Sequence, residues 1–212
     1  VAVVTAITVF ANRMELSLER QSNSFLAADR VVSGRFDIPT DWLAMPEQYG
    51  LQQAKVVSFS SMVFAGDEMH LAAVKAVSEK YPLRGRLEVS ATAFASNEDV
   101  VVTDKVPAQG EVWVDSRILA LLGIQLGDFL AVGESDFRVT KVVFREPDQT
   151  SGFSVMGPRV LMNVADLAAT EVVLPGSRIS YRWLLAGEAK DIAGFEKELL
   201  PLLGEHYRLR NV

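Results

Sequence analysis

The sequence predicts an α+β fold in which both chain ends build one subdomain and a β-rich segment is inserted into it. Two polar stretches rich in turn formers, Ala95–Gly110 and Glu146–Gly152, divide the chain into three parts. The middle part alternates apolar and polar residues in short runs, which is typical of strands. The outer parts each follow a β-α-β order. We therefore place one subdomain at residues 27–92 and 155–212, and the inserted β-rich subdomain at residues 93–154.

The middle segment, Gly110–Pro147, predicts a strand, a short helix and a hairpin in succession. Val112–Val114 alternates in the manner of a strand. Asp115 or Ser116 can cap the helix that follows, because a side-chain oxygen there accepts from a free backbone N–H. Gly123 stands where a left-handed residue should end that helix. The remaining predicted elements of this segment are strands at Phe129–Val132 and Phe137–Phe144.

The outer parts supply the other predicted elements. Before the middle segment we expect, in order, a strand at Ala28–Ser33, a helix that starts at Pro39–Asp41 and is limited by Pro46, a hairpin of Gln53–Ala65 with Met69–Val77, a rigid connection at Tyr81–Gly85, and strands at Arg86–Thr92 and Val100–Thr103. After it we expect a strand at Arg159–Met162, a helix near Val164–Ala169, a strand at Ile179–Leu185, a helix at Glu188–Leu200 and a last strand at Tyr207–Val212.

The first 26 residues predict a helix with two interpretations. Val1–Phe10 is almost wholly apolar, and apolar residues recur behind it at helical spacing as far as Phe25. One interpretation is an amphipathic helix packed on the core. The other is the outer end of a transmembrane helix that continues into a stalk, residues 1–26. About ten apolar residues are fewer than the ~20 that a span needs, so the rest of such a span would precede Val1.

Composition and motifs argue against several classes of function. The net charge is −6 and the sequence pI is about 5.0, which disfavours a nucleic-acid partner because such proteins need a basic stripe. Without cysteine, the chain has no disulfides, thiolate metal sites or cysteine nucleophile. No nucleophile elbow, phosphate loop or zinc-binding helix motif is present, and Asp67, Glu68 and His70 fit a solvated turn better than a metal site. We expect a scaffold or transducer without catalytic residues or cofactor.

One apolar set is a candidate binding surface: Phe59, Met62, Phe64 and Met69. Both odd-numbered and even-numbered residues of this strand are apolar, so both faces of the strand could simply be buried in a sheet. The alternative is an exposed face that meets a partner subunit or holds an acyl chain. Replacing Phe59 or Phe64 with Asp distinguishes the two, because a folded variant indicates a surface and an unfolded one indicates core.

An ordered series of motifs resembles the extracytoplasmic domain of MacB/FtsX-type ABC transporter permeases, most closely their YbbP-like branch. The middle segment carries E-V-W-V-D-x-R-x-L-x-x-L-G-x-x-x-G-D, then F-x-V-x-x-V, then E-P-D. The L-G-x-x-x-G-D piece alone is weak, because many small β-barrels contain it. The pieces that complete the series in order are Ser58–Phe64, Val74–Val77, Tyr81–Gly85, Arg159–Asn163 and Pro175–Arg178.

The resemblance implies a porter-like subdomain built from residues 27–92 and 155–212, with a sabre-like β-rich subdomain inserted at residues 93–154. It places the chain between the first two transmembrane helices, on the periplasmic side of the cell inner membrane. It further implies a cytoplasmic ATP-binding subunit, a second permease copy, and a lipid or lipoprotein among the conceivable cargoes, with no catalytic residue in this domain. Stalk helices would transmit ATP-driven movement, and the two subdomains would hinge near Ala93 and Ser154.

Two other interpretations remain open from the residues. The run L-G-I-Q-L-G-D-F-L-A-V also resembles substrate-binding modules of AAA-type ATPases, which predicts a soluble β-barrel adaptor. A small hydrolase using Ser58–Ser61 would need a base, and His70 is the histidine on the next predicted strand. A tight hairpin at Gly66–Glu68 places His70 opposite residues near Phe64 and away from Ser58, so the predicted geometry counts against it.

Overall fold

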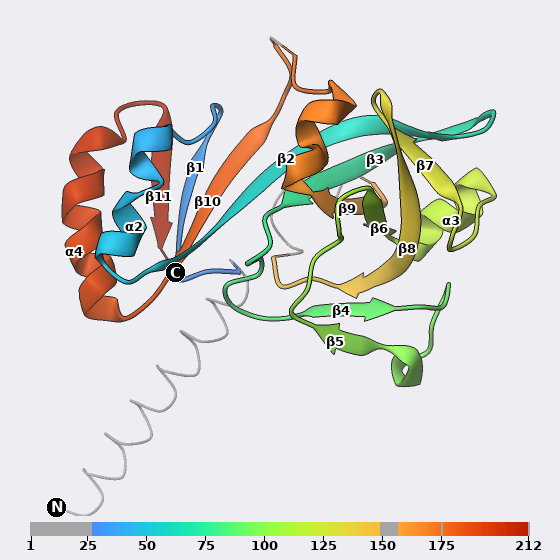
Figure 1. Cartoon of the computed structure of the whole chain (residues 1–212), viewed down its shortest axis with the longest axis horizontal. Helices are drawn as coiled ribbons and strands as arrows, with labels where there is room; N and C mark the ends of the chain where they lie inside the picture. Colours follow the sequence, from blue (N-terminus) through green and yellow to red (C-terminus); the bar gives the residue numbers. More distant parts are fainter. Residues whose placement is uncertain (1–26, 149–156, 175, 212) are drawn as a thin grey trace, which may run out of the picture.

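The computed structural model describes residues 27–148, 157–174 and 176–211 and has a mixed α+β fold (Figure 1). One large twisted sheet is accompanied by few helices, as the sequence predicted. The predicted helix or stalk at residues 1–26 lies outside the described residues. Among those that are described, no helix is both long and apolar enough to cross a bilayer.

The strands, in chain order, are β1 (Arg30–Gly34), β2 (Gln52–Ala65), β3 (Glu68–Val77), β4 (Leu87–Ser90), β5 (Val101–Thr103), β6 (Glu111–Val114), β7 (Phe129–Val132), β8 (Ser135–Arg145), β9 (Arg159–Asn163), β10 (Ser180–Ala186) and β11 (Tyr207–Asn211). The helices are α2 (Met45–Gln48), α3 (Ser116–Leu122), α4 (Ala189–Leu199) and the 3-10 turns Thr40–Trp42, Asn97–Asp99, Val164–Thr170 and Leu200–Leu202.

The long hairpin of β2 and β3 is the centre of the sheet. The strand order is β11-β1-β10-β2-β3-β9-β6-β8-β4-β5, and β7 pairs with both β2 and β8. β2 is bonded to β10 over its first half and to β7 at Val63 and Phe64, near its far end. Gly66 closes the hairpin at a φ of +58°, which glycine adopts without strain. The predicted hairpin is therefore confirmed, with β2 linking the two ends of the sheet (Figure 1).

Helices cover one face of the sheet at two places. α4 and α2 pack on β1 and β10, where Trp183 meets Phe195 edge-to-face at 5.8 Å between ring centroids. α3 buries Ile118 and Leu122 against the odd-numbered residues of β2, such as Val57. Because side chains alternate along a strand, the even-numbered residues of β2 point to the opposite face. That face buries its own cluster, which includes Val56, Val77, Tyr81, Leu161 and Leu184.

Local signals determine the boundaries of α3. The Asp115 carboxylate accepts from the Arg117 backbone N–H at 3.0 Å, so the N-cap is Asp115, one of the two predicted candidates. Gly123 ends the helix in the left-handed conformation, at a φ of +63°. The predicted effect of Pro46 is wrong. It lies in the first turn of α2, where its missing N–H has no helical acceptor, so it begins the helix rather than limiting it.

Sheet pairing continues across the predicted subdomain boundary. β6 pairs with β9, β8 with β4 and β7 with β2, and in each pair one strand lies within residues 93–154 and the other outside it. The division into two subdomains stays a prediction, and any movement between them must bend or twist this shared sheet.

Two glycines with the same backbone conformation allow a controlled test of the β7–β8 turn. Gly66 and Gly133 both have φ +58°, but a Cβ at Gly66 meets nothing within 4 Å, whereas at Gly133 it would lie 2.0 Å from the Thr170 carbonyl oxygen. We expect Gly66→Ala to cost about 1–2 kcal/mol, the penalty of a left-handed alanine. Gly133→Ala should cost clearly more, since the backbone at Thr170 must also move. Urea unfolding midpoints measure both, and equal losses would contradict the close approach of Thr170 to this turn.

Candidate functional site

The far end of the β2–β3 hairpin exposes large apolar side chains. Phe64 lies opposite Met69 and Met62 opposite Leu71, so all four share one face. All are exposed, and Met69 has 61% of its surface accessible. Phe129 of β7 joins them, because β7 pairs with β2 at Phe64 and Phe129 follows the same alternation. We call these five residues the apolar hairpin surface.

Phe59 does not belong to this surface, which corrects the predicted set. It is 3% exposed and lies opposite Val74 in the core that α3 covers. The reason is parity: residues 59 and 64 are five apart, so they point to opposite faces of one strand. The sequence pattern was apolar at both parities and could not separate them. The role of Met62, Phe64 and Met69 in binding a partner or cargo stays a prediction.

Two members of the surface, Leu71 and Phe129, were not predicted from the sequence. Leu71 stands in a run of apolar residues in β3, and its exposure follows from the hairpin register alone. Phe129 is distant in sequence and joins the surface through the β2–β7 pairing. A hairpin that turns at Gly66 has a register that places Leu71 on the exposed face, so this residue could have been predicted. No signal close to Phe129 in the sequence showed that it would join the same face.

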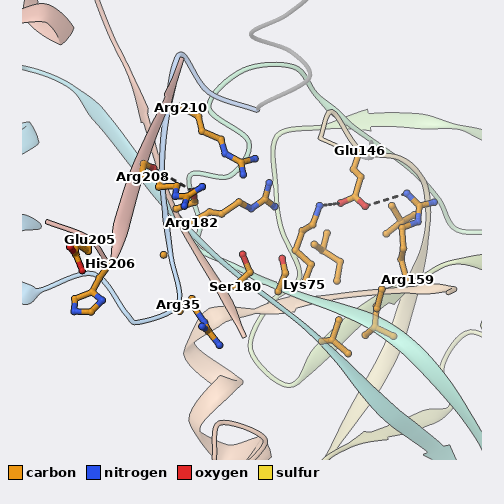
Figure 2. A pocket seen from close by; sticks show the side chains of 18 residues that line it. Arg35, Lys75, Glu146, Arg159, Ser180, Arg182, Glu205, His206, Arg208 and Arg210 are labelled. Carbon is orange, nitrogen blue, oxygen red and sulfur yellow. Dashed lines mark hydrogen bonds and ion pairs between the residues drawn. The ribbon is translucent and has the colours of Figure 1, made fainter. Parts of the chain in front are cut away.

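A cavity of about 450 Å³ opens on the same sheet face, closer to the start of the hairpin (Figure 2). The strands β11, β1 and β10 form one side, and β3 and β9 the other. Its lining residues are Ser33, Gly34, Arg35, Ser58, Ala73, Val74, Lys75, Val143, Glu146, Arg159, Val160, Leu161, Ser180, Arg182, Glu205, His206, Arg208 and Arg210. We call this cavity the basic pocket, because six lysine or arginine side chains line it against two glutamates.

Strand alternation brings the arginines of β11 into the basic pocket. Arg208 and Arg210 lie on one face of β11, and Tyr207 and Leu209 pack on the helix side of the sheet. Ser33 of β1 is paired with both Arg208 and Arg182, which places these two arginines on the same face. Figure 2 shows Arg182, Arg210 and Lys75 directed toward the same part of the pocket.

Two buried carboxylates hold the cations of the pocket: Glu146 lines it, and Asp148 contacts the lining residues Lys75 and Arg182. The Lys75 ammonium is 2.7 Å from a Glu146 oxygen and 3.0 Å from an Asp148 oxygen. Arg182 contacts the other Asp148 oxygen at 2.7 Å, and Arg159 contacts Glu146 at 3.3 Å. Both acids are at most 4% exposed. Buried charges are stable only when they are paired in this way, so these contacts join β3, β9 and β10 to the segment after β8.

Asp148 is held as a carboxylate. Burial alone would raise its pKa, but the charges of Lys75 and Arg182 and a hydrogen bond from the Tyr81 hydroxyl outweigh burial, so the pKa lies well below the ordinary aspartate value. The pKa of Tyr81 is raised well above 10, first by its complete burial and then by the neighbouring charge of Asp148. Asp148 therefore stays charged at neutral pH.

Ser58 lines the pocket, and its buried hydroxyl has no hydrogen-bond partner among the described residues. Ser58 is 4% exposed and lies opposite Lys75 on one side and Ser180 on the other. His70 lies opposite Val63, five residues along β2 and on the other face, as the hairpin prediction required. Neither His70 nor Lys75 bonds the hydroxyl, so the nucleophile–base contact of a serine hydrolase is absent from the described part of the chain.

Little in the sequence indicated the network. Glu146 and Asp148 stand in a polar, proline-containing stretch that we predicted as a boundary loop, and such stretches are usually solvated. Their burial depends on Lys75, Arg159 and Arg182, all distant in sequence. These cations come together because β10 pairs with β2, β2 with β3, and β3 with β9.

Comparisons with known proteins agree with the fold. Over 210 residues, or 98% of the chain, it is 37% identical to the uncharacterised ABC transporter permease YbbP of Escherichia coli strain K12, and it spans about a quarter (24%) of that protein. The periplasmic region of MacB from Actinobacillus actinomycetemcomitans has a similar structure, with a TM-score of 0.50, 15% identity, and coverage of 88% of this chain and 91% of that one. The chain is therefore similar in sequence to part of an ABC transporter permease and shares the fold of the periplasmic region of MacB.

Other structures share this MacB-like fold. The extracellular domain of the noncanonic ABC-type transporter YknZ from Gram-positive bacteria matches with a TM-score of 0.57 at 12% identity, covering 86% of this chain and all of that one. A domain of a putative permease protein from Porphyromonas gingivalis matches with a TM-score of 0.52 at 10% identity, over 88% and 91% of the two chains. No protein-family model matches the chain.

The motifs that carry the MacB/FtsX resemblance converge on the buried network. Five of the motif pieces contribute members to it, and Arg182 is the member that lies outside them. The contributors from the motif pieces are Lys75, Tyr81, Asp115, Glu146, Asp148 and Arg159. The resemblance therefore marks residues that connect the sheet, which is a structural role.

Replacing Asp148 should destabilise the fold strongly. Asp148→Asn leaves the buried cations Lys75 and Arg182 short of counter-charge, which we expect to cost about 3–5 kcal/mol in the free energy of unfolding. Chemical denaturation at neutral pH measures this loss. Asp104→Asn, at an exposed site before β6, is the control and should change little. A loss no larger than that of the control would contradict the pairing.

The same residue predicts acid sensitivity. Because folding lowers the pKa of Asp148, its contribution is complete above the unfolded value of ~3.9 and is lost progressively as the pH falls below it. Unfolding free energies measured from pH 7 downward should therefore fall less steeply for Asp148→Asn than for the wild type. Parallel curves would show that Asp148 is not the linked group.

The parity of β2 predicts opposite outcomes for two aspartate substitutions. Phe59→Asp buries an unpaired charge in the core, so we expect loss of the folded state. Phe64→Asp places the charge at a position that is 40% exposed, so the protein should stay folded with a small change in melting temperature. Circular dichroism during thermal unfolding measures both. Unfolding of Phe64→Asp would mean that the hairpin surface is core.

Proposed function

We propose that this chain is the extracytoplasmic part of an ABC transporter permease in the inner membrane, and that it couples ATP hydrolysis to the handling or export of a lipophilic substrate. The observation that carries the proposal is the 37% identity to a permease over nearly the whole chain. The fold it shares with the periplasmic region of MacB and the extracellular domain of YknZ supports a position outside the cytoplasmic membrane. The comparisons do not favour the alternative of a soluble adaptor.

The proposed partners are a cytoplasmic ATP-binding subunit, reached through the transmembrane part, and a second copy of the permease. The chain contains no phosphate-binding loop of its own, so ATP chemistry would reside in the separate subunit. A lipid or lipoprotein is the proposed cargo. The apolar hairpin surface supports this class, because exposed apolar patches usually mark binding sites.

Movement would reach the hairpin through the sheet. Stalk helices would shift on ATP binding, and the strands nearest the chain ends, β1 and β11, would receive that shift. β10 connects them to β2, which carries the apolar hairpin surface at its far end. Because strands of both predicted subdomains are paired in one sheet, the movement would be a twist or bend of that sheet.

Distances between labels in the intact transporter test the coupling. In a transporter whose other cysteines have been replaced, Leu121→Cys on α3 and Lys197→Cys on α4 give one label in each predicted subdomain, because these 212 residues contain no cysteine. In bilayers, ATP should change the distance between them by more than about 2 Å. Glu47→Cys with Lys197→Cys, both on the helix side of β10, is the control pair and should not change. An unchanged distance in the test pair would refute subdomain movement.

A further inference from the structure

We propose that the basic pocket binds the oxyanion headgroup of a single-chain amphiphile, and that the amphiphile's acyl chain lies along the apolar hairpin surface. The proposal deepens the proposed function by naming the substrate class, and its link to transport rests on that function. Binding itself depends only on this chain.

The first observation is uncompensated positive charge. Arg35, Arg208 and Arg210 line the pocket, and none has an ion-pair partner among the residues that the structure describes. Of the two pocket glutamates, Glu146 already pairs with Lys75 and Arg159, and Glu205 forms no ion pair with these arginines in the described part of the chain. A chain with net charge −6 thus concentrates cations at one cavity. Guanidinium groups bind oxyanions with paired, charge-assisted hydrogen bonds, which makes an oxyanion the matching ligand.

The second observation is the orphaned hydroxyl of Ser58. It is buried in the pocket wall, and buried hydroxyls are nearly always hydrogen-bonded. It lies between Ser180 and Lys75 on the neighbouring strands, in the row of polar side chains that crosses the pocket. An oxyanion there would accept from the hydroxyl and satisfy it.

The third observation is the apolar continuation. The pocket is larger than a small anion needs, and the side chains of Ala73, Val143 and Leu161 lie on its face of the sheet and contribute apolar lining. Ser58 shares its face of β2 with Met62 and Phe64, so this face runs from the polar row onto the apolar hairpin surface. Phe64 is six positions along the strand from Ser58, a distance of about 20 Å, which suits an extended acyl chain. One ligand with a charged head and one apolar chain fits both regions.

Binding of dodecyl phosphate to the 212-residue chain, below its micelle concentration, tests the proposal by calorimetry. Inorganic phosphate and the uncharged dodecyl maltoside are the two comparison ligands. We expect dodecyl phosphate to bind at least about tenfold more tightly than either, and binding to weaken as salt rises, because the arginines are exposed. Equal binding of the maltoside would show that no anion is recognised. Equal binding of phosphate would show a free-anion site, and absence of binding would refute the proposal outright.

Variants locate the ligand. Arg208→Gln with Arg210→Gln should weaken dodecyl phosphate binding about tenfold or more, and Arg178→Gln, an exposed arginine outside the pocket, should not. Phe64→Ser with Met69→Ser should also weaken it, and Val101→Ser, on exposed β5, should not. If either test pair bound like its control, the corresponding half of the proposal would be wrong.

Ser58→Ala separates binding from folding. The hydroxyl has no partner to lose among the described residues, so the ligand-free variant should melt no lower than the wild type. Its affinity for dodecyl phosphate should fall about three- to tenfold. Ser60→Ala, on the same face but outside the pocket lining, is the matched control. A lower melting temperature with unchanged affinity would make Ser58 purely structural. The binding measurements use no ATP, so an absence of dodecyl phosphate binding would leave the transporter proposal standing. Likewise, an unchanged label distance in the intact transporter would leave the binding proposal standing.

Discussion

The pairing of Asp148 and Glu146 with Lys75, Arg159 and Arg182 is the constraint on which the sheet depends. Burying two carboxylates is costly, and each here is offset by at least two cationic contacts. The contacts come from three strands and from the segment that follows β8. The arrangement of β3, β9 and β10 around that segment is therefore determined by charge as well as by backbone pairing.

The same network shapes the basic pocket. Its cations cannot turn away from the interior, because they hold the two acids. Arg208 and Arg210 approach from β11 with no acid of their own in the described structure. On one side of the pocket the cations are held in place by Glu146 and Asp148, and on the other side the arginines form no ion pair in the described structure. The pocket can therefore present positive charge to a ligand while its walls stay in place.

Features determined by residues that are close in sequence could be predicted, whereas contacts between residues far apart in the chain could not. The cap at Asp115, the end of α3 at Gly123 and the hairpin at Gly66 are determined within a few residues, and all were predicted. Pro46 was misjudged because two helical turns adjoin there, and the pattern did not show which one contained it. Phe59 and Phe64 could not be separated because both parities were apolar. The buried acids could not be found, since their partners lie far away in the chain.

The unbroken length of β2 has a mechanical consequence. Its 14 residues extend about 46 Å, with β10 bonded to the first half and β7 bonded near the far end. The part beyond Ser58 is seven residues, or about 23 Å, so tilting it by about 10° would move its tip by about 4 Å. The basic pocket lies at the inner end of this part and the apolar side chains lie near the tip. A charged head would therefore move less than its apolar tail.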